Sequence, residues 1–163
     1  MRAGGSKSKG SSFERVVAKL IITAGEDLGF TKRDVYRTPL SGGHVFAKHK
    51  HPSDLVMTKK VLRVFPASIE CKHYKKFELQ NLWTRQGLLF DWIDQALRAT
   101  EGTRVNPVVV FKWNLSKIFC VFEAGKFRIT TNTYMQFRFR KKYWNVILFT
   151  NLLRGVFDCG RKL

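Results

Sequence analysis

Apolar residues recur at helical spacing near the start of the chain. Spacings of three and four residues place side chains on one face of a helix, so this stripe predicts a helix over residues 13–24. Its members are Phe13, Val16, Val17, Leu20, Ile21 and Ala24. A second stripe, between Leu82 and Leu97, predicts a second amphipathic helix. Residues 1–12 are rich in Gly, Ser and Lys, and they predict a flexible basic arm.

Short runs of apolar and β-branched residues predict strands between and after these helices. The runs cover residues 35–37, 55–57, 61–71, 108–113, 118–122, 127–131 and 135–140. Pro66 predicts a bulge or a sheet edge within the third run. Residues 144–157 fit a strand or a helix equally well. Because neither a repeat nor a change of composition divides residues 13–163, we expect one α/β domain with a central mixed β-sheet flanked by helices.

The composition indicates a folded protein that meets a polyanion. Hydrophobic residues make up 44% of the 163 residues and include 14 Phe, which argues against disorder. Thirty Lys and Arg against twelve Asp and Glu give a net charge of +18. Nucleic acid is the commonest partner of so basic a domain. A protein that only binds nucleic acid, of a ribosomal or packaging type, has the same composition.

Several functional classes find no support in the sequence. Charged residues at positions 14, 15 and 19 interrupt any signal-peptide core, and the apolar run 143–153 is shorter than the roughly 20 residues of a membrane span. We therefore expect no membrane association and a cytoplasmic location, in a prokaryotic cell or a phage-infected host. Three separated cysteines fit reduced thiols of a cytosolic protein. The absence of a Gly-x-x-x-x-Gly-Lys-Ser/Thr sequence predicts no nucleotide cofactor.

Acidic residues are scarce, and two of them stand in a suggestive order. Asp54 ends one short element, and a later apolar run ends in Glu70-Cys71-Lys72. Side chains alternate along a strand, so Glu70 and Lys72 should share a face while Cys71 points into the sheet. If the segment around Asp54 lies beside that strand, two carboxylates and an ammonium converge. Such a set can hold a divalent metal and orient water for attack on a phosphodiester, which predicts a nuclease.

Four segments resemble the PD-(D/E)xK nuclease superfamily, and within it the archaeal-type Holliday junction resolvases and their phage relatives. They are residues 9–15, 37–43, 53–56 and 69–72, which span roughly the first half of the chain. The resemblance implies a restriction-endonuclease-like fold and a metal-dependent endodeoxyribonuclease that resolves four-way DNA junctions as a homodimer. Ser53 stands where the superfamily motif has proline. The second half of the chain carries no matching motif.

The resemblance also implies roles for individual residues. Asp54 and Glu70 would bind Mg²⁺ or Mn²⁺, and Glu14 would complete the metal site from the first helix. Lys72 would position or activate the attacking water. Ser41 matches a loop serine that assists cleavage in some of these resolvases.

Each of these residues also has a purely structural interpretation. Ser11-x-x-Glu14 fits a capping box, in which both side chains bind backbone donors at a helix start. Asp54 fits a turn residue at a strand end. Glu70 and Lys72 fit a surface ion pair on an edge strand. Ser41, before two glycines, fits a turn.

The histidines suggest other metal chemistry. His49-x-His51 fits a histidine-metal nuclease, although no matching Asn/His helix follows. His44 lies in the same loop. Cys71-x-His73 has the residue types of a zinc site, but Cys71 is expected to face the core.

Positive side chains near these motifs are expected to contact DNA phosphates. Those assigned to DNA binding are Lys9, Arg15, Arg37, His73, Lys75, Lys76 and Arg85. A second basic run, residues 138–142, is interleaved with aromatic residues. Nothing predicts readout of base edges, so recognition should follow DNA shape. Apolar residues between Phe111 and Phe149 are expected to form the homodimer interface. The rival functions are a nuclease of the same fold with another target (linear duplex, flap or restriction site) and a non-catalytic nucleic-acid-binding protein.

Overall fold

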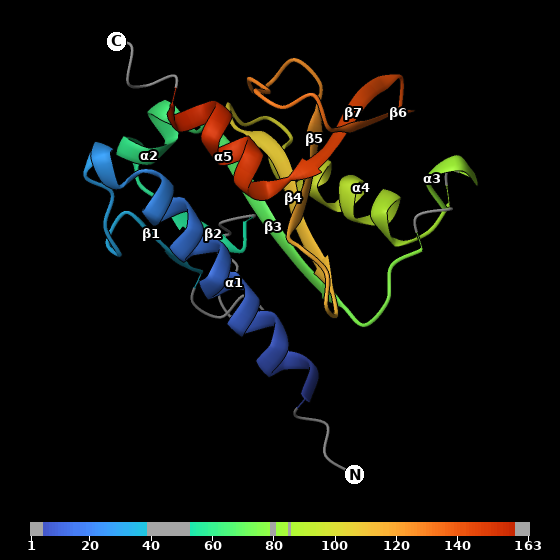
Figure 1. Ribbon diagram of the computed structural model, residues 1–163, viewed down its shortest axis with the longest axis horizontal. Helices are drawn as coiled ribbons and strands as arrows, with labels where there is room; N and C mark the ends of the chain where they lie inside the picture. Colours follow the sequence, from blue (N-terminus) through green and yellow to red (C-terminus); the bar gives the residue numbers. More distant parts are fainter. Residues whose placement is uncertain (1–4, 39–52, 79–80, 85, 159–163) are drawn as a thin grey trace.

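The chain folds into a mixture of helices and strands, and the computed structural model describes residues 5–38, 53–78, 81–84 and 86–158 (Figure 1). The first half contains α1 (Gly5–Ala24), the 3-10 helix η1 (Glu26–Leu28), β1 (Val35–Arg37), β2 (Leu55–Met57), α2 (Lys59–Val64) and β3 (Ala67–Tyr74). The second half contains α3 (Asn81–Thr84), α4 (Leu88–Thr100), β4 (Asn106–Trp113), β5 (Phe119–Glu123), β6 (Met135–Phe139), β7 (Lys142–Leu148) and α5 (Phe149–Phe157).

The central sheet has five strands in the order β3-β4-β5-β7-β6. Strands β3 and β4 are parallel, whereas the other neighbouring strands are antiparallel. A parallel pair needs a crossover, and the segment containing α3 and α4 provides it. Strands β1 and β2 form a separate antiparallel pair. The predicted α/β fold with a mixed central sheet is confirmed.

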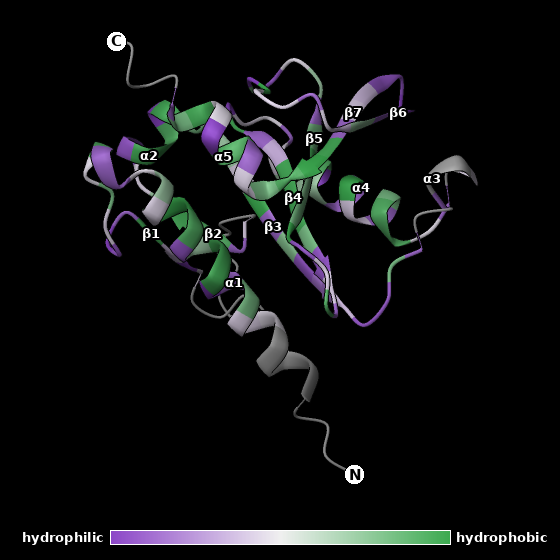
Figure 2. Cartoon of the chain, viewed as in Figure 1, coloured by the Kyte–Doolittle hydropathy of each residue, from purple (hydrophilic) through white to green (hydrophobic). Residues whose placement is uncertain are grey.

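Both faces of the sheet are covered by helices, with α1, α2 and α5 on one side and α4 on the other (Figure 1). Successive residues of β4 therefore enter different cores: Val108 and Val110 pack with α1 and α5, and Val109 and Phe111 pack with α4. A strand buried on both faces is apolar in its buried part, as β4 is from Pro107 to Phe111. Figure 2 shows the hydrophobic residues concentrated between the helices and the sheet.

Helix α1 begins at Gly5 and not at Phe13. Residues 5–12, predicted as part of a flexible arm, are therefore helical, and that prediction is wrong for them; residues 1–4 lie outside the described residues. Ser11 lies inside the helix, so the capping box that would pair Ser11 with Glu14 at a helix start is also excluded. Serine and glycine have modest helix propensity, which is why the sequence pattern missed this first part.

Three other predicted elements differ from the structure. Residues 61–64 belong to α2, since Thr58 begins a short helix there and Pro66 separates it from β3. Residues 127–131 form turns and irregular backbone although Phe127 is buried. The second predicted helix divides into α3 and α4, with Gly87 at a φ of 96° before α4. The ambiguous run 144–157 is strand up to Leu148 and helix from Phe149.

No helix in the described part of the chain is both long and apolar enough to span a bilayer.

Candidate active site

Strand β3 lies at one edge of the central sheet, and the segment before β2 runs along its open side. The backbone N–H of Asp54 donates to the Ile69 carbonyl oxygen at 2.9 Å. The Ser53 hydroxyl donates to the same carbonyl at 2.9 Å and accepts the Ile69 N–H at 3.0 Å. These bonds bring Asp54 beside Glu70 although β2 itself pairs with β1.

Glu70 and Lys72 point to the same face of β3, as the alternation of strand side chains predicts. The Lys72 ammonium lies 2.7 Å from Glu70 Oε1. Cys71, between them, packs against the core formed with α1. The Lys72 and Glu70 side chains are only 18% and 10% exposed, so this pair is more deeply enclosed than a typical surface ion pair.

Gln95 of α4 holds both members of the pair. Its Nε2 donates to Glu70 Oε1 at 2.7 Å, and its Oε1 accepts from the Lys72 ammonium at 2.9 Å. The amide thus fixes the spacing between the carboxylate and the ammonium. Sequence reasoning missed Gln95, because a glutamine on the polar face of an amphipathic helix carries no distinguishing signal.

Asp54 is held against the same strand and is electrostatically strained. Its Oδ2 accepts the Cys71 N–H at 2.7 Å. Burial raises the pKa of Asp54 from 3.8 to about 7, and the negative charges of Glu70 and Glu14 add to the increase. The Cys71 N–H and the Lys72 ammonium oppose it only in part. A nearby cation would favour the ionised form of this carboxylate.

Glu14 reaches the same region from α1. It is buried, with only 8% of its surface exposed, and it forms an ion pair with Arg37 of β1. Its negative charge contributes to the raised pKa of Asp54, so the two carboxylates are close enough to interact. Three separate stretches of backbone therefore place Glu14, Asp54 and Glu70 close enough for the charges of the two glutamates to act on Asp54.

Comparison with family models finds a match over residues 5–153 to the family described as "Phage putative PDDEXK endonuclease". The chain belongs to this family. Among solved structures it is similar to the Archaeoglobus fulgidus Hjc, a Holliday junction resolvase from an archaeal hyperthermophile. The identity is 21%, the TM-score is 0.47, and the match covers 93% of this chain and 98% of that chain. A comparison with curated proteins finds no match.

Membership in a phage PDDEXK endonuclease family confirms the resemblance to the PD-(D/E)xK superfamily and its phage members. It also agrees with the restriction-endonuclease-like fold predicted from the sequence. The matched region includes Asp54, Glu70 and Lys72, and it extends through most of α5. The family match therefore includes most of the second half of the chain, in which the sequence carries no recognisable motif.

The remaining predicted residues of this PDDEXK endonuclease are placed in different ways. Ser41, Arg85, His44, His49 and His51 lie outside the described residues. Lys9 belongs to α1, and Arg15, Lys75 and Lys76 are exposed. The His73 ring packs on Phe13 with ring centroids 5.7 Å apart, and Arg37 is engaged with Glu14. These two predicted DNA contacts therefore already have partners within the protein.

The donor set suits a hard divalent cation. Within the described ranges, no three His, Cys, Asp or Glu side chains form a preassembled metal cluster. Each of the three carboxylates accepts a bond from a protein donor. Asp54 uses Oδ2 and Glu70 uses Oε1 in these bonds, which leaves Oδ1 and Oε2 for a ligand role. Carboxylate oxygens are the ligands that Mg²⁺ prefers. Burial and the neighbouring carboxylates raise the pKa of the Cys71 thiol, which disfavours the thiolate that zinc requires.

Proposed function

We propose that this chain is a divalent-metal-dependent endodeoxyribonuclease that resolves four-way DNA junctions. The observation that supports it most is the raised pKa of Asp54 beside Glu70 and Glu14. A carboxyl group such as that of Asp54, whose ionisation is disfavoured by burial and by neighbouring negative charge, is stabilised by a cation and is typical of functional sites. Family membership supports nuclease chemistry, and the resemblance of the N-terminal motifs to junction resolvases supports the substrate.

In this proposal Asp54 and Glu70 hold Mg²⁺, for which Mn²⁺ can substitute, and Glu14 completes the site. The metal, when bound, lowers the pKa of a coordinated water and neutralises charge that builds on the scissile phosphate. Lys72, kept in place by Gln95, orients the water or the phosphate on the same face of β3. Hydrolysis leaves a 5′-phosphate and a 3′-hydroxyl, as the resemblance implies. We place this activity in the cytoplasm of a prokaryotic cell or a phage-infected host.

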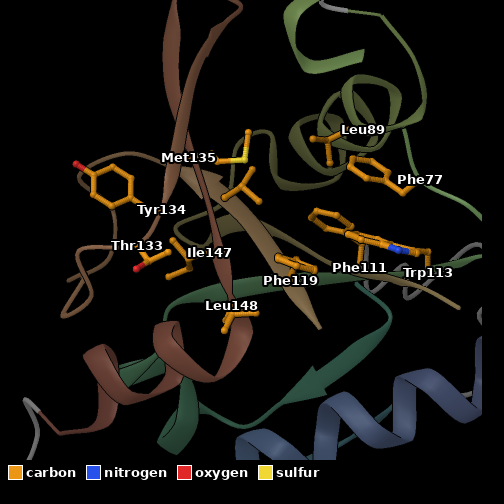
Figure 3. Close-up of a pocket in the computed structure, with 11 residues that line it drawn as sticks. Phe77, Leu89, Phe111, Trp113, Phe119, Thr133, Tyr134, Met135, Ile147 and Leu148 are labelled. Carbon is orange, nitrogen blue, oxygen red and sulfur yellow. The ribbon is translucent and has the colours of Figure 1, made fainter. Parts of the chain in front are cut away.

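A homodimer completes the proposed resolvase, because two symmetric strands of a junction must be cut. An apolar groove of about 220 Å³ opens at the end of the sheet where α4 begins. Figure 3 shows that its walls come from β4, β5, β7, α4 and the segment that leads into β6. Tyr134 and Met135 are 49% and 37% exposed at its rim. The groove lies mainly within residues 111–149, where the sequence predicts the interface, and a second copy fits it by two-fold symmetry.

A cleavage assay tests the proposal directly. Wild type, Glu70→Ala and the control Glu123→Ala are incubated with Mg²⁺ and either a four-way junction or a linear duplex of equal sequence. Glu123 suits the control because it is ion-paired with Lys142 at 2.7 Å, as Glu70 is with Lys72. We expect paired symmetric nicks in the junction for wild type and Glu123→Ala, and none for Glu70→Ala.

Two other outcomes identify the rival functions. Cleavage of linear duplex as fast as of the junction would assign a nuclease with a broader DNA target. Binding of DNA without any cutting, in Mg²⁺ and in Mn²⁺, would assign a non-catalytic nucleic-acid-binding protein.

A further inference from the structure

The hairpin between β6 and β7 carries a dense run of positive charge at the sheet edge opposite the catalytic strand. Residues 138–142 read Arg-Phe-Arg-Lys-Lys. Phe139 pairs with Lys142, so Arg140 and Lys141 alone form the turn. Strand β6 is the edge of the sheet farthest from β3 in the strand order. This surface, Arg138 to Lys142, is called the hairpin tip below.

The backbone of the hairpin tip is strained. Arg140 has a φ of 48° and Lys141 a φ of 62°, and both lie in the left-handed region. Two-residue hairpin turns of this kind favour Asn-Gly or Asp-Gly, because longer side chains are disfavoured there. Backbone strain of this kind is often found at binding sites. The two long cationic residues at these positions therefore indicate that their side chains have a role in binding and not in forming the turn.

Two ion pairs fix the hairpin tip to the rest of the molecule. The Arg140 guanidinium binds Asp94 of α4 in a bidentate manner, with Nη2 2.8 Å from Oδ2 and Nε 2.5 Å from Oδ1. Lys142 binds Glu123 of β5 at 2.7 Å. The turn is therefore held in one position, which lowers the entropy lost when a ligand binds.

Two cations of the hairpin tip remain uncompensated. Arg138 and Lys141 are exposed, and neither forms an ion pair with any described residue. The Arg138 guanidinium lies over the Tyr143 ring at 6.0 Å. Arg138, Phe139, Arg140 and Lys141 line a shallow hollow of about 290 Å³. A concave surface with two unpaired positive charges, one of them the Arg138 guanidinium, suits a phosphate group.

One helix connects the hairpin tip with the carboxylate site. Asp94, which binds Arg140, and Gln95, which binds Glu70 and Lys72, are consecutive residues of α4. The two sites are therefore fixed relative to each other. A branched substrate has several backbone segments, so a segment that is not being cut can lie against a second, rigidly placed cationic surface.

We propose that the hairpin tip binds backbone phosphates of a second DNA arm while the scissile strand lies at β3. This inference rests on the proposed function for its substrate. DNA is the partner because the hollow is lined by cationic residues, because the whole chain carries +18, and because phosphate contacts require no base sequence.

The test measures how salt affects DNA binding. Arg138→Gln combined with Lys141→Gln is compared with the control Lys32→Gln combined with Lys59→Gln. The control removes equal charge from two exposed positions, one in α2 and one in the segment before β1, which contacts the start of α2. Binding of a labelled four-way junction is followed by fluorescence anisotropy at several KCl concentrations without divalent metal. Each lost phosphate contact makes the slope of log association constant against log salt concentration shallower by about 0.9. For the hairpin variant, which loses two contacts, we therefore expect a slope shallower than that of wild type by about 1.8. Equal slopes for the hairpin and control variants would overturn the inference.

Lys141→Gly separates binding from turn formation. Glycine adopts a φ of 62° without strain, so we expect an equal or higher Tm together with a slope shallower by about 0.9. A higher Tm with unchanged DNA binding would mean that Lys141 is merely tolerated in the turn, which would refute its role.

A third readout distinguishes this inference from the proposed function. Single-turnover cleavage of the junction by wild type, with saturating protein and Mg²⁺, tests the carboxylate site independently of the hairpin tip. If wild type cuts nothing while the hairpin variant loses salt dependence, the nuclease proposal fails and the phosphate site stands. If wild type resolves junctions and the hairpin variant binds them as wild type does, only the hairpin inference fails.

Discussion

Asp54 is the residue whose environment differs most from that of an ordinary surface carboxylate. Burial and the charges of Glu70 and Glu14 raise its pKa to about 7, yet its position is fixed by the Cys71 N–H. Such an arrangement destabilises the ionised, metal-free protein and favours binding of a cation. Asp34 provides the opposite case, because hydrogen bonds from Thr31 lower its pKa.

The pKa shift of Asp54 predicts how stability depends on pH. Between pH 3.8 and about 7 the folded protein keeps a proton that the unfolded chain has released, so stability falls as pH rises and the loss is complete above about pH 7. Asp54→Asn removes this titration and retains an oxygen that can accept the Cys71 N–H. In EDTA at pH 8 we expect the variant to be more stable by about 1 to 4 kcal/mol, with little difference near pH 4.

Urea unfolding at both pH values provides the measurement, and Asp34→Asn is the control with the opposite sign. The lowered pKa of Asp34 contributes stability that is present above the unfolded pKa and is lost as pH falls, so Asp34→Asn should be less stable than wild type at pH 8. Equal stability of Asp54→Asn and wild type at pH 8 would show that Asp54 ionises normally.

Gln95 is expected to act as a positioning residue for Lys72 and Glu70. Gln95→Ala removes both hydrogen bonds, and loss of such supporting contacts typically reduces activity about 10- to 100-fold. Because Gln95 is exposed on α4, the Tm and the affinity for DNA should change little. Single-turnover cleavage beside binding curves measures this, with Arg98→Ala on the same helix as the control. A loss of DNA affinity in place of a loss of rate would contradict the positioning role.

Sequence reasoning identified the residues that a strand pattern or a family motif can reveal. The shared face of Glu70 and Lys72 follows from alternation along a strand, and the structure confirms it. Gln95 could not be found, because its role depends on where α4 packs against β3. The burial of Glu14 was equally hidden, since it depends on how α1 packs against β1 and β3.

At the scale of elements, packing decides several outcomes that local patterns leave open. Residues 61–64 contain β-branched residues typical of strands but form α2, because Val61 inserts into the core beside α1 and Pro66 ends the segment. The helix after β7 was undecided in the sequence, as apolar residues there suit both states. Tertiary contacts override such weak local preferences. The long stripes of α1 and α4, by contrast, were read correctly as helices.

Gly155 in α5 offers a test of this packing. An added Cβ would lie 2.3 Å from the backbone oxygen of Arg128, in the segment that follows β5. Alanine is the better helix former by about 1 kcal/mol, but the overlap with backbone should outweigh this gain. We expect Gly155→Ala to lower the free energy of unfolding by about 2 kcal/mol in urea titration.

Gly10→Ala in α1 is the matched control, because no atom beyond its chain neighbours and the nearby backbone of its own helix lies within 4 Å of the added Cβ. It should stabilise the protein by up to about 1 kcal/mol. If Gly155→Ala is as stable as Gly10→Ala, the distance between α5 and the Arg128 backbone must be large enough to accept a methyl group, which would contradict the close contact at Gly155.

At the scale of the whole molecule, two features are consistent with the proposed DNA substrate and the proposed dimer. The chain carries a net charge of +18, and cationic surfaces occur both near β3 and at the hairpin tip on the opposite sheet edge. The apolar groove at the end of the sheet is separate from the carboxylate site. These surfaces suit a dimer that holds several DNA arms at once.

The proposed dimer predicts a stable two-chain species at micromolar concentration in sedimentation velocity. Met135→Asp places a charge at the rim of the groove and should give monomers, because a buried unpaired carboxylate opposes association. Paired nicking of junctions should be lost, while single nicks persist. Thr150→Asp, at an exposed position on α5, should remain dimeric. A wild-type monomer would count against junction resolution.

Titration of the metal-free protein with Mn²⁺ tests the central claim most directly, since all the proposed chemistry depends on a cation between Asp54 and Glu70. Isothermal calorimetry at pH 8, where Asp54 is ionised, compares wild type, Glu70→Ala and Glu123→Ala. We expect Glu70→Ala to bind Mn²⁺ at least about tenfold more weakly than wild type, and Glu123→Ala to bind as wild type does. Equal Mn²⁺ affinity in wild type and Glu70→Ala would contradict the metal site at the edge of β3.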